Sequence, residues 1–593
     1  MFFDEKIQEL AKNIFHQSPS GESLSVKLDC VLCISLAASI ISTSISNGQS
    51  EEKLSFDYWI GRIGRTHHVE MRDILYDVIY PRANPDLRKA VDYLAESNVN
   101  ARTFTSITYN FFSFSPDQTF IRDFVDYIVE HHYSQIFPHC HIPLPVSMLC
   151  VEILKPINGL FYDFTAGFGT NCITAYKHSQ NKEGHLGVYA YEANATVHAV
   201  SVVRTFIHNI PYTATSFEDF VEYSPYLFAN HHLSFVSQDI HQIENLRHGR
   251  GIVITSAGVL YDSTNRHVRK NLIYTKHIEA VIALPGNILD HTAAPLYMLV
   301  MNKYEPEKDP NILMIQTDTL FQKNNTTRII DGLTSIINKV TSIYENRLLK
   351  DGVSTLVSFD ELVKEDYVLL PNRYVRPSSI KSEIGSVSID LAKMQNWPKI
   401  GDFAKSIYRG LVLPKKSLDN TGQERVVINY ADVQDGELNF QNLKMHVIKN
   451  PERYIVYQND VIVSCKGVTI KTCVIPPEAE GACLSLNFIG IRLDKSECDP
   501  RYLKYYLDSP VGLAYLKSRQ IGTSIKTLKN ADLKDMPILL PPIDKQKEIV
   551  KEFESRQQEI IEKINRLQST LIDEKNNLYQ QMKLGDVMAM VDE

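Results

Sequence analysis

An acidic residue, a glycine-rich turn and a second acidic residue follow two successive apolar runs in this chain. The first run leads into Asp163-Phe164-Thr165-Ala166-Gly167-Phe168-Gly169, and the second leads into Glu192-Ala193-Asn194. Glycine permits a sharp turn and a close approach to a ligand because it has no Cβ. An acid at the end of the next strand can accept hydrogen bonds from ribose hydroxyls. The pattern favours a nucleoside-bearing cofactor in a doubly wound sheet, and an ordinary strand-to-helix turn is the alternative.

Several blocks around this turn resemble the modification subunit of type I restriction-modification systems, an adenine-N6 DNA methyltransferase that uses S-adenosylmethionine. The blocks are Ile142-Pro143 with the apolar helix 146–154, the Asp163 turn, Glu192-Ala193-Asn194 leading to Arg204, and the segments 251–260, 269–272, 278–285 and 295–303. The resemblance implies a Rossmann-like methyltransferase domain with S-adenosylmethionine as its cofactor. The candidate cofactor-binding residues are Asp163, Thr165, Ala166, Gly167, Gly169, Glu192 and Asn194.

One motif of that family is missing. In the family a strand ends in Asn-Pro-Pro-Phe or a close variant, which accepts hydrogen bonds from the adenine amino group and stacks on the flipped base. We expect the equivalent strand at Leu233-Ser234-Phe235-Val236, followed by Ser237-Gln238-Asp239-Ile240, which has neither a proline nor a ring. Ser224-Pro225-Tyr226 lies upstream in a segment expected to be irregular. The short stretch up to Gly251 also predicts that the target-base pocket is degenerate.

Three functions follow from this pattern. The favoured one is a sequence-specific DNA-binding protein of restriction-modification or phage defence, in which the methyltransferase-like domain serves recognition and assembly. The alternatives are an active adenine-N6 DNA methyltransferase with an atypical catalytic loop and a DNA-binding regulator or anti-restriction protein. Cofactor binding is open too, because Phe164, Phe168 and Ile142 replace a proline, a small residue and a threonine of the family.

The last third of the chain resembles one half of a type I specificity subunit, which reads the DNA sequence in those systems. The blocks that carry the resemblance are 400–403, 408–410, 427–436, 459–467, 502–507, 522–523 and 533–542, ending at Lys545-Gln546. Its cations are candidates for contacts with phosphates and base edges. They are Arg409, Lys415, Lys416, Lys466, Lys471, Arg519 and Lys526. Taken singly, each of them is more often an ordinary solvated side chain than a DNA contact.

A long helix with a coiled-coil seam is predicted after Pro542. Apolar residues recur there at alternating steps of three and four, which is typical of a coiled coil. The seam consists of Val550, Phe553, Gln557, Ile560, Ile564, Leu567, Leu571, Glu574 and Leu578. Specificity subunits usually carry two recognition domains and two such helices, whereas this chain has one of each. We therefore predict a homodimer that reads two DNA half-sites, and an amphipathic helix packed on its own domain is the alternative.

The predicted fold class is α/β with a helical beginning and a helical end. The expected domains are a helical N-terminal domain (1–137), the doubly wound methyltransferase-like domain (138–345), a connecting segment (346–396), a mixed α/β target recognition domain (397–543) and the coiled-coil helix (544–593). Ser335 to Leu349 is expected to be a connecting helix, and Ser378 to Ser388 a flexible link. Candidate core residues of the first domain are Phe56, Tyr58, Trp59 and Ile60.

Composition supports a cytoplasmic protein whose DNA surface is local. The formal net charge of −8 argues against a globally basic coat, and no ATP-binding phosphate loop is found. The apolar stretch from Val31 to Ile41 is too short to span a bilayer and is expected to form a core helix. Cys30-x-x-Cys33 lies in that stretch and is expected to pack in the core, while His139-Cys140-His141 lacks the rest of a zinc set. We predict no metal, and partners that include double-stranded DNA and other restriction or defence subunits.

Overall fold

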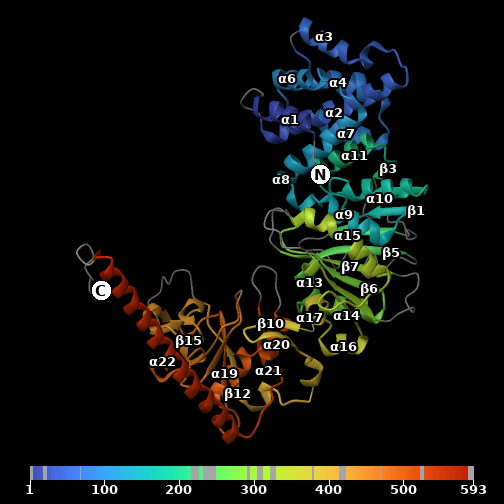
Figure 1. Ribbon diagram of the computed structural model, residues 1–593. Coiled ribbons are helices and arrows are strands. Elements are labelled where there is room, and N and C mark those ends of the chain that lie inside the picture. The colour runs from blue at the N-terminus through green and yellow to red at the C-terminus, as the bar shows by residue number, and fades with distance from the viewer. Residues whose placement is uncertain are drawn as a thin grey trace. The chain divides into compact units, whose positions relative to one another are not determined.

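The computed structural model divides into two compact units, Met1–Pro377 and Ser378–Glu593 (Figure 1). It describes residues 4–17, 23–66, 68–214, 226–230, 249–289, 294–302, 311–320, 329–376, 379–394, 396–412, 422–467, 469–520 and 527–584. The division between the units falls inside the connecting segment that the sequence predicts.

Helices make up the first part of unit 1, as predicted, and they form a layer of their own beside the sheet in Figure 1. They are α1 (Glu5–Gln17), α2 (Leu24–Ser46), α3 (Phe56–Thr66), α4 (Met71–Ile74), α5 (Pro85–Ala95), α6 (Ala101–Phe112), α7 (Gln118–Ile128) and α8 (Ser134–Ile136). Asn84, Asn100 and Asp117 begin α5, α6 and α7 by accepting a backbone N–H in the first turn. Trp59 is fully buried, and its indole donates to the carbonyl of Lys53 at 2.9 Å.

Helix α2 is longer than the apolar stretch that the sequence marks. Its 23 residues make it the one helix of the described residues that is long and apolar enough to cross a bilayer, which corrects the prediction that the segment is too short. In the fold, 83% of its most apolar window is buried inside the protein, and Cys30 and Cys33 are both buried there. A helix that is apolar on every side is what the centre of a helical domain requires. The prediction of a core helix is confirmed.

A nine-stranded sheet forms the second part of unit 1. Its strands are β1 (Gly159–Asp163), β2 (Leu186–Ala190), β3 (Tyr212–Ala214), β4 (Tyr226–Asn230), β5 (Arg250–Ser256), β6 (Ile278–Ala283), β7 (Leu296–Asn302), β8 (Ile312–Gln316) and β9 (Ser354–Val357). They lie in the order β3-β2-β1-β4-β5-β7-β6-β8-β9, with β7 antiparallel between β5 and β6. The order reverses between β1 and β4, which is where a doubly wound sheet opens a crevice at its carboxyl edge. The predicted fold class is confirmed.

Helices connect and cover these strands. They are α9 (Leu144–Leu154), α10 (Thr170–Asn181), α11 (Ala195–Ile207), α13 (Ala257–Tyr261), α14 (Arg266–Tyr274), α15 (Ile329–Glu345), α16 (Phe359–Lys364) and α17 (Pro371–Tyr374). Arg269 of α14 is 1% exposed and donates to the carbonyls of Tyr367 and Val259 at 2.9 and 2.8 Å. This buried arginine joins two of the family-like blocks, because Arg269 belongs to the block 269–272 and Val259 to the block 251–260.

Two connecting segments differ from their predictions. The helix expected from Ser335 to Leu349 is α15, which packs on α9 as part of the domain and ends at Glu345. The link expected to be flexible from Ser378 to Ser388 contains a hairpin of β10 (Ser379–Ser382) and β11 (Gly385–Ser388). Strand β9 also joins the sheet beyond the predicted boundary at residue 345. The polar composition of residues 378–388 suggested a loop. Strand pairing, however, satisfies the backbone hydrogen bonds of polar residues as well as those of apolar ones.

Unit 2 is a mixed α/β domain followed by one long helix. Its strands are β12 (Ala404–Arg409), β13 (Gln423–Ile428), β14 (Val433–Gln434), β15 (Glu437–Leu438), β16 (Lys444–Ile448), β17 (Val461–Ser464), β18 (Thr472–Val474), β19 (Cys483–Leu484) and β20 (Phe488–Leu493). The main sheets have the orders β12-β20-β17-β18 and β16-β13-β19. The helices are α18 (Ile400–Phe403), α19 (Pro500–Asp508), α20 (Pro510–Arg519), α21 (Asn530–Lys534) and α22 (Ile543–Gln581).

The base of α22 is attached to the domain by Gln546. This side chain is fully buried, and its amide donates to the carbonyls of Glu497 and Pro541 while its oxygen accepts the N–H of Asp499 at 2.9 Å. Three hydrogen bonds to backbone groups explain a glutamine at the Lys545-Gln546 junction, since a buried amide without partners would be costly. The helix therefore begins at a fixed point of the domain.

Candidate functional site

The glycine turn after β1 meets the loop after β2 through backbone hydrogen bonds. Tyr191 donates to the carbonyl of Asp163, and Ala166 donates to the carbonyl of Tyr191, both at 2.9 Å. Gly167 and Gly169 have φ values of +52° and +79°, a region that side chains with a Cβ rarely adopt. The structure thus brings the predicted cofactor residues together at one edge of the sheet.

Glu192 holds this turn through both of its carboxylate oxygens. One oxygen accepts the N–H of Gly167 at 3.0 Å and the other accepts the N–H of Asn194 at 2.9 Å. Asn194 in turn caps α11 by accepting the N–H of Val197. A carboxylate offers about four lone-pair positions, so Glu192 keeps acceptor capacity for a hydroxyl. Burial raises the pKa of Glu192, and these backbone N–H groups oppose that shift.

Asp163 is fully buried and has no cationic partner among the described residues. It accepts the N–H of Thr165 at 3.1 Å and the amide of Asn171, in the first turn of α10, at 3.2 Å. Burial raises the pKa of Asp163 to about 7, and these two hydrogen bonds only partly oppose the shift. Asn171 is a participant that the sequence analysis missed, because nothing in its spacing marks it.

Close packing within the protein explains why positions 167 and 169 are glycines. A Cβ on Gly167 would collide with the carbonyl oxygen of Cys140, and a Cβ on Gly169 would crowd the hydroxyl of Ser201. The bulky Phe168 is buried against Tyr133 and His141 of the helical layer. The large ring at position 168 therefore packs in the core and does not fill the turn.

Arg204 links this turn to the helical domain. Its guanidinium pairs with Asp126 of α7 at 2.8 Å and donates to the carbonyl of Phe168 and the hydroxyl of Thr170 at 3.0 and 2.9 Å. His208 also lies 3.0 Å from Asp126. Burial alone would raise the pKa of Asp126, but Arg204 and His208 together hold it below its usual value. Arg204 ended one family-like block, whereas Asp126 carried no signal in the sequence.

The strand beside β1 lies earlier than the sequence suggested. β4 runs from Tyr226 to Asn230, pairing Phe228 with Asp163 and Asn230 with Ile254 of β5. The segment expected to be irregular upstream of the strand therefore contains the start of β4. The predicted strand Leu233-Ser234-Phe235-Val236 and the motif position Ser237-Gln238-Asp239-Ile240 lie outside the described residues.

The residues to compare with the family's Asn-Pro-Pro-Phe motif are therefore those at the end of β4. Asn230 is the last residue of the strand and is followed in the sequence by His231-His232-Leu233. An asparagine thus stands at the carboxyl end of the central strand, while both prolines and the aromatic residue are replaced. The signal that could have found it is the run Tyr226-Leu227-Phe228-Ala229, which is short and apolar as a buried strand requires.

The described candidate DNA-binding cations have different surroundings. Arg409 ends β12 with its guanidinium 3.6 Å from the sulfur of Cys465, next to Lys466. Lys471 donates to the carbonyls of Tyr430 and Val433 and lies 4.4 Å from the Tyr430 ring centre. That gives Lys471 a structural role. Arg519 ends α20 over the ring of Tyr515, and Lys415, Lys416 and Lys526 lie outside the described residues.

The recognition domain contains an ion pair whose acid is buried. Asp460 is 2% exposed and accepts both Nε and Nη2 of Arg492 at 3.0 and 2.8 Å, together with the hydroxyl of Tyr408 at 2.7 Å. The guanidinium lies 4.2 Å from the ring centre of Tyr457. The block that begins at Asn459 therefore supplies a structural acid at the centre of the domain.

The predicted seam of α22 is exposed along most of its length. Val550 is buried, and Phe553 packs on Tyr505 of α19 with ring centres 5.0 Å apart. Beyond these, the apolar seam residues are between 46% and 70% exposed, with Leu567 the most exposed. The domain therefore leaves this apolar stripe uncovered beyond Phe553.

Two family models match the chain in succession. Residues 217–383 match the family described as N-6 DNA Methylase, and residues 394–569 match the type I restriction modification DNA specificity domain. The first match begins after the glycine turn, so the turn is identified by the strand order and by its own residues. The chain carries both domains in one polypeptide, as a fused methylase–specificity protein would.

Individual relatives agree with this division. The chain is 32% identical over 136 residues to the methylase subunit of the type I restriction enzyme MjaVII from Methanocaldococcus jannaschii, covering 23% of this chain and 24% of that protein. The HindI methylase subunit of Haemophilus influenzae is 23% identical over 380 residues, which covers 54% of this chain and 83% of the relative. The matched region thus spans about a quarter of the length of the first of these relatives.

A solved structure aligns with the chain at low identity. The methyltransferase subunit of a type I restriction-modification system from Streptococcus thermophilus aligns with a TM-score of 0.46 and 17% identity. The alignment covers 62% of this chain and 98% of that one.

Proposed function

We propose that this protein recognises specific DNA sequences within a restriction-modification or phage-defence system and that its methyltransferase-like domain acts in recognition and assembly. The observation that supports the proposal is the end of β4. Asn230 is followed by His231-His232-Leu233, so the prolines that shape the family's turn and the ring that stacks on a flipped base are both replaced. Residues 231–249 are all that separate β4 from β5, which leaves little chain to build a base pocket. A cytoplasmic location is part of this proposal.

The residues of the turn fit the nucleoside end of S-adenosylmethionine, and we include its binding in the proposal. Gly167 turns the backbone at the carboxyl end of β1, and Glu192 keeps free acceptor positions for ribose hydroxyls. Phe168 packs into the helical layer. When bound, this cofactor supplies an electrophilic methyl group. Glu192 and the backbone of the turn would hold it.

An active adenine-N6 methyltransferase is the second candidate, and Asn230 is the observation that favours it. The register places this asparagine two residues beyond the row that joins Asp163 to Phe228, roughly 7 Å along the strand. The family uses a polar residue at this end of the strand to bind the adenine amino group. An active enzyme with an altered turn would need a polar residue at this position, and Asn230 supplies it.

Methyl transfer to unmethylated genomic DNA separates the two candidates. The full-length protein is incubated with labelled S-adenosylmethionine, beside the variants Asn230→Ala and Glu192→Ala. We expect no transfer by any of the three proteins, together with cofactor binding that Glu192→Ala weakens and Asn230→Ala leaves unchanged. Transfer that disappears in Asn230→Ala would instead establish the active enzyme. A triple variant, His231→Pro, His232→Pro and Leu233→Phe, is expected to remain inactive because the connection to β5 stays short.

DNA recognition is assigned to the target recognition domain. Arg409 and Lys466 flank Cys465, which groups two cations on one side of the domain. Cations that contact phosphates release counterions on binding, so their loss lowers both affinity and its salt dependence. We expect Arg409→Met with Lys466→Met to weaken binding to a selected DNA site and to reduce the salt slope by about two. Lys495→Met removes an exposed lysine of the same domain and is the matched control.

A homodimer through α22 completes the proposal. Ile560, Ile564, Leu567 and Leu571 form the exposed part of the seam, and a second copy would bury it as one side of a coiled coil. We expect Leu567→Asp to give a monomer in sedimentation experiments. Ser569→Asp, which places the same charge on the opposite side of the helix, should leave the dimer intact. A wild-type monomer at micromolar concentration would contradict this part of the proposal.

A further inference from the structure

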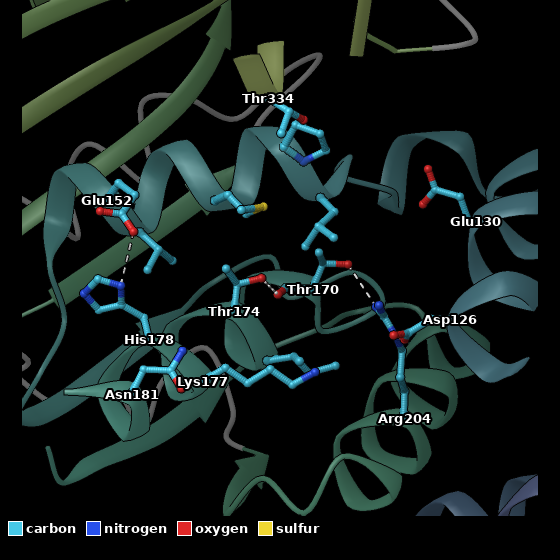
Figure 2. Close-up of a pocket in the computed structure, with 15 residues that line it drawn as sticks. Asp126, Glu130, Glu152, Thr170, Thr174, Lys177, His178, Asn181, Arg204 and Thr334 are labelled. Carbon is cyan, nitrogen blue, oxygen red and sulfur yellow. Dashed lines mark hydrogen bonds and ion pairs between the residues drawn. The ribbon is translucent and has the colours of Figure 1, made fainter. Parts of the chain in front are cut away.

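A groove of about 490 Å³ lies along α10, the helix that follows the candidate cofactor turn. It runs between α9 and α10 and is bounded by α7, by Arg204 of α11 and by Thr334 of α15. Figure 2 shows Glu152 and His178 at one end and Asp126 and Arg204 at the other. Its size falls within the range of sites that hold small organic molecules.

The middle of the groove is apolar. Leu144, Met148 and Val151 of α9 face Ile173 of α10 across it. A surface of this kind gains from covering the body of an apolar or aromatic molecule, because each buried methylene contributes about 0.8 kcal/mol. Met148 is 38% exposed, so the apolar wall is accessible.

The charged groups around the groove are paired, with one exception. Glu152 lies 3.5 Å from His178, Glu130 lies 2.9 Å from His141, and Asp126 pairs with Arg204. Lys177 alone has neither a hydrogen bond nor an ion pair within 4 Å among the residues that the structure describes. Figure 2 shows its side chain extended along the groove. Burial lowers the pKa of Lys177 and the nearby Arg204 and Arg122 act in the same direction, while Asp126 and Asp123 oppose them. An anion beside the ammonium group would remove this cost.

We propose that this groove binds a small organic anion, with an apolar or aromatic body over α9 and a single acidic group at Lys177. None of the groove residues belongs to the set predicted to hold the methyl donor. The site is nevertheless connected to that turn, because Arg204 lines the groove and donates to the carbonyl of Phe168 and the hydroxyl of Thr170. A ligand in the groove would therefore act as an effector, because it would alter the contacts of Arg204 at the start of α10.

The test uses anilinonaphthalene sulfonate, which has an aromatic body and one permanent negative charge. The full-length protein is titrated with this probe by fluorescence, and we expect one saturable site. Lys177→Met keeps the length of the side chain without its charge and should weaken binding about tenfold, the loss of one charge-assisted contact. Lys182→Met, at the exposed end of the same helix, is the matched control and should change the affinity less than about twofold.

A second variant tests the shape of the site independently. Thr174 lines the groove midway along α10 and donates only to the carbonyl of Thr170 at 2.7 Å, so Thr174→Trp should fill the groove and abolish binding at the saturable site. Circular dichroism and thermal melting establish that both variants are folded. Binding that is unchanged in both folded variants, or no saturable binding to the wild type, would overturn the proposal.

Discussion

Two buried aspartates, one in each unit of the protein, differ in whether they have a cationic partner. Asp460 of the recognition domain is paired with Arg492 through two hydrogen bonds and also accepts from Tyr408. Asp163 of the methyltransferase-like domain accepts only from a backbone N–H and from the amide of Asn171. Glu192 is close enough to add a like charge, which raises the pKa of Asp163 further beyond the effect of burial.

The difference indicates what each acid is for. A buried charge with a full set of partners holds a domain in one arrangement, and removing one partner leaves the other without compensation. A buried carboxyl with a pKa near 7 and no cation lowers the stability of the fold near neutral pH. Such costs are concentrated at functional sites. Asp460 is thus a structural residue of the recognition domain, whereas the surroundings of Asp163 are consistent with the proposed cofactor site.

The largest effect is expected from Asp460→Asn. The substitution removes the charge that holds Arg492 and should destabilise unit 2 by about 3 kcal/mol. Hydrogen exchange at the amides of β17 and β20 measures the change locally. Asp535→Asn breaks an exposed pair with Lys399 and should cost less than about 1 kcal/mol. Equal effects of the two variants would break the distinction between the buried and the exposed pair.

An intermediate effect is expected from Gly167→Ala. Alanine at a positive φ costs about 1–2 kcal/mol, and here the added Cβ would also collide with the carbonyl of Cys140. Gly481 of unit 2 has a φ of +88°, and no atom lies within 4 Å of the place where a Cβ would stand, so Gly481→Ala should show the backbone cost alone. We expect the stability that unit 1 loses in Gly167→Ala, measured by urea unfolding, to exceed the stability that unit 2 loses in Gly481→Ala by at least about 1 kcal/mol. A similar cost for both variants would show that the turn can move away from Cys140.

The effect with the most clearly defined sign is the pH dependence of Asp163→Asn. The carboxyl titrates near 7 in the folded protein and at the ordinary value of 3.8 when unfolded. Unfolding therefore releases a proton between these values, and the wild type loses stability as the pH rises from 3.8 to 7. Asparagine removes this loss, so the stability of the variant relative to the wild type should increase by about 1.4 kcal/mol per pH unit in that window. Melting temperatures at a series of pH values from about 5 to about 8 measure it.

The control for this prediction is an aspartate that stays in water. Asp92→Asn replaces an exposed carboxyl of α5 in the same unit, and its melting temperature should follow the wild type at every pH. A wild type that gains stability relative to Asp163→Asn as the pH rises toward neutrality would show that Asp163 has a cationic partner in solution.

Much of the recognition domain and of the cofactor turn is predictable from sequence, because local patterns carry it. Asp163, the two glycines and Glu192 lie at the ends of short apolar runs, and strand ends of a parallel sheet meet at one edge. The helix from Ile543 to Gln581 follows from its heptad spacing in the same way. Each of these features depends on residues that are near one another in the chain.

Local sequence patterns do not identify which segment forms the strand next to β1. Tyr226–Asn230 and Leu233-Ser234-Phe235-Val236 are both short and apolar, so periodicity does not separate them. Pairing with β1 on one side and β5 on the other selects the first. The polar segment after residue 378 was misjudged for a related reason, because hairpin pairing satisfies a backbone whose side chains give no strand signal.

Local sequence patterns were enough to predict three features: an acidic and glycine-rich turn, a specificity-type domain and a helix with one apolar stripe. Tertiary structure alone decided which groups serve as partners. Arg204 meets Asp126 across 78 residues of sequence, Asp163 is left without a cation among the described residues, and Lys177 faces a groove in which the other charges are paired. The physical reason is that the pKa of a buried group and the cost of its charge depend on neighbours in space, and only packing brings those neighbours together.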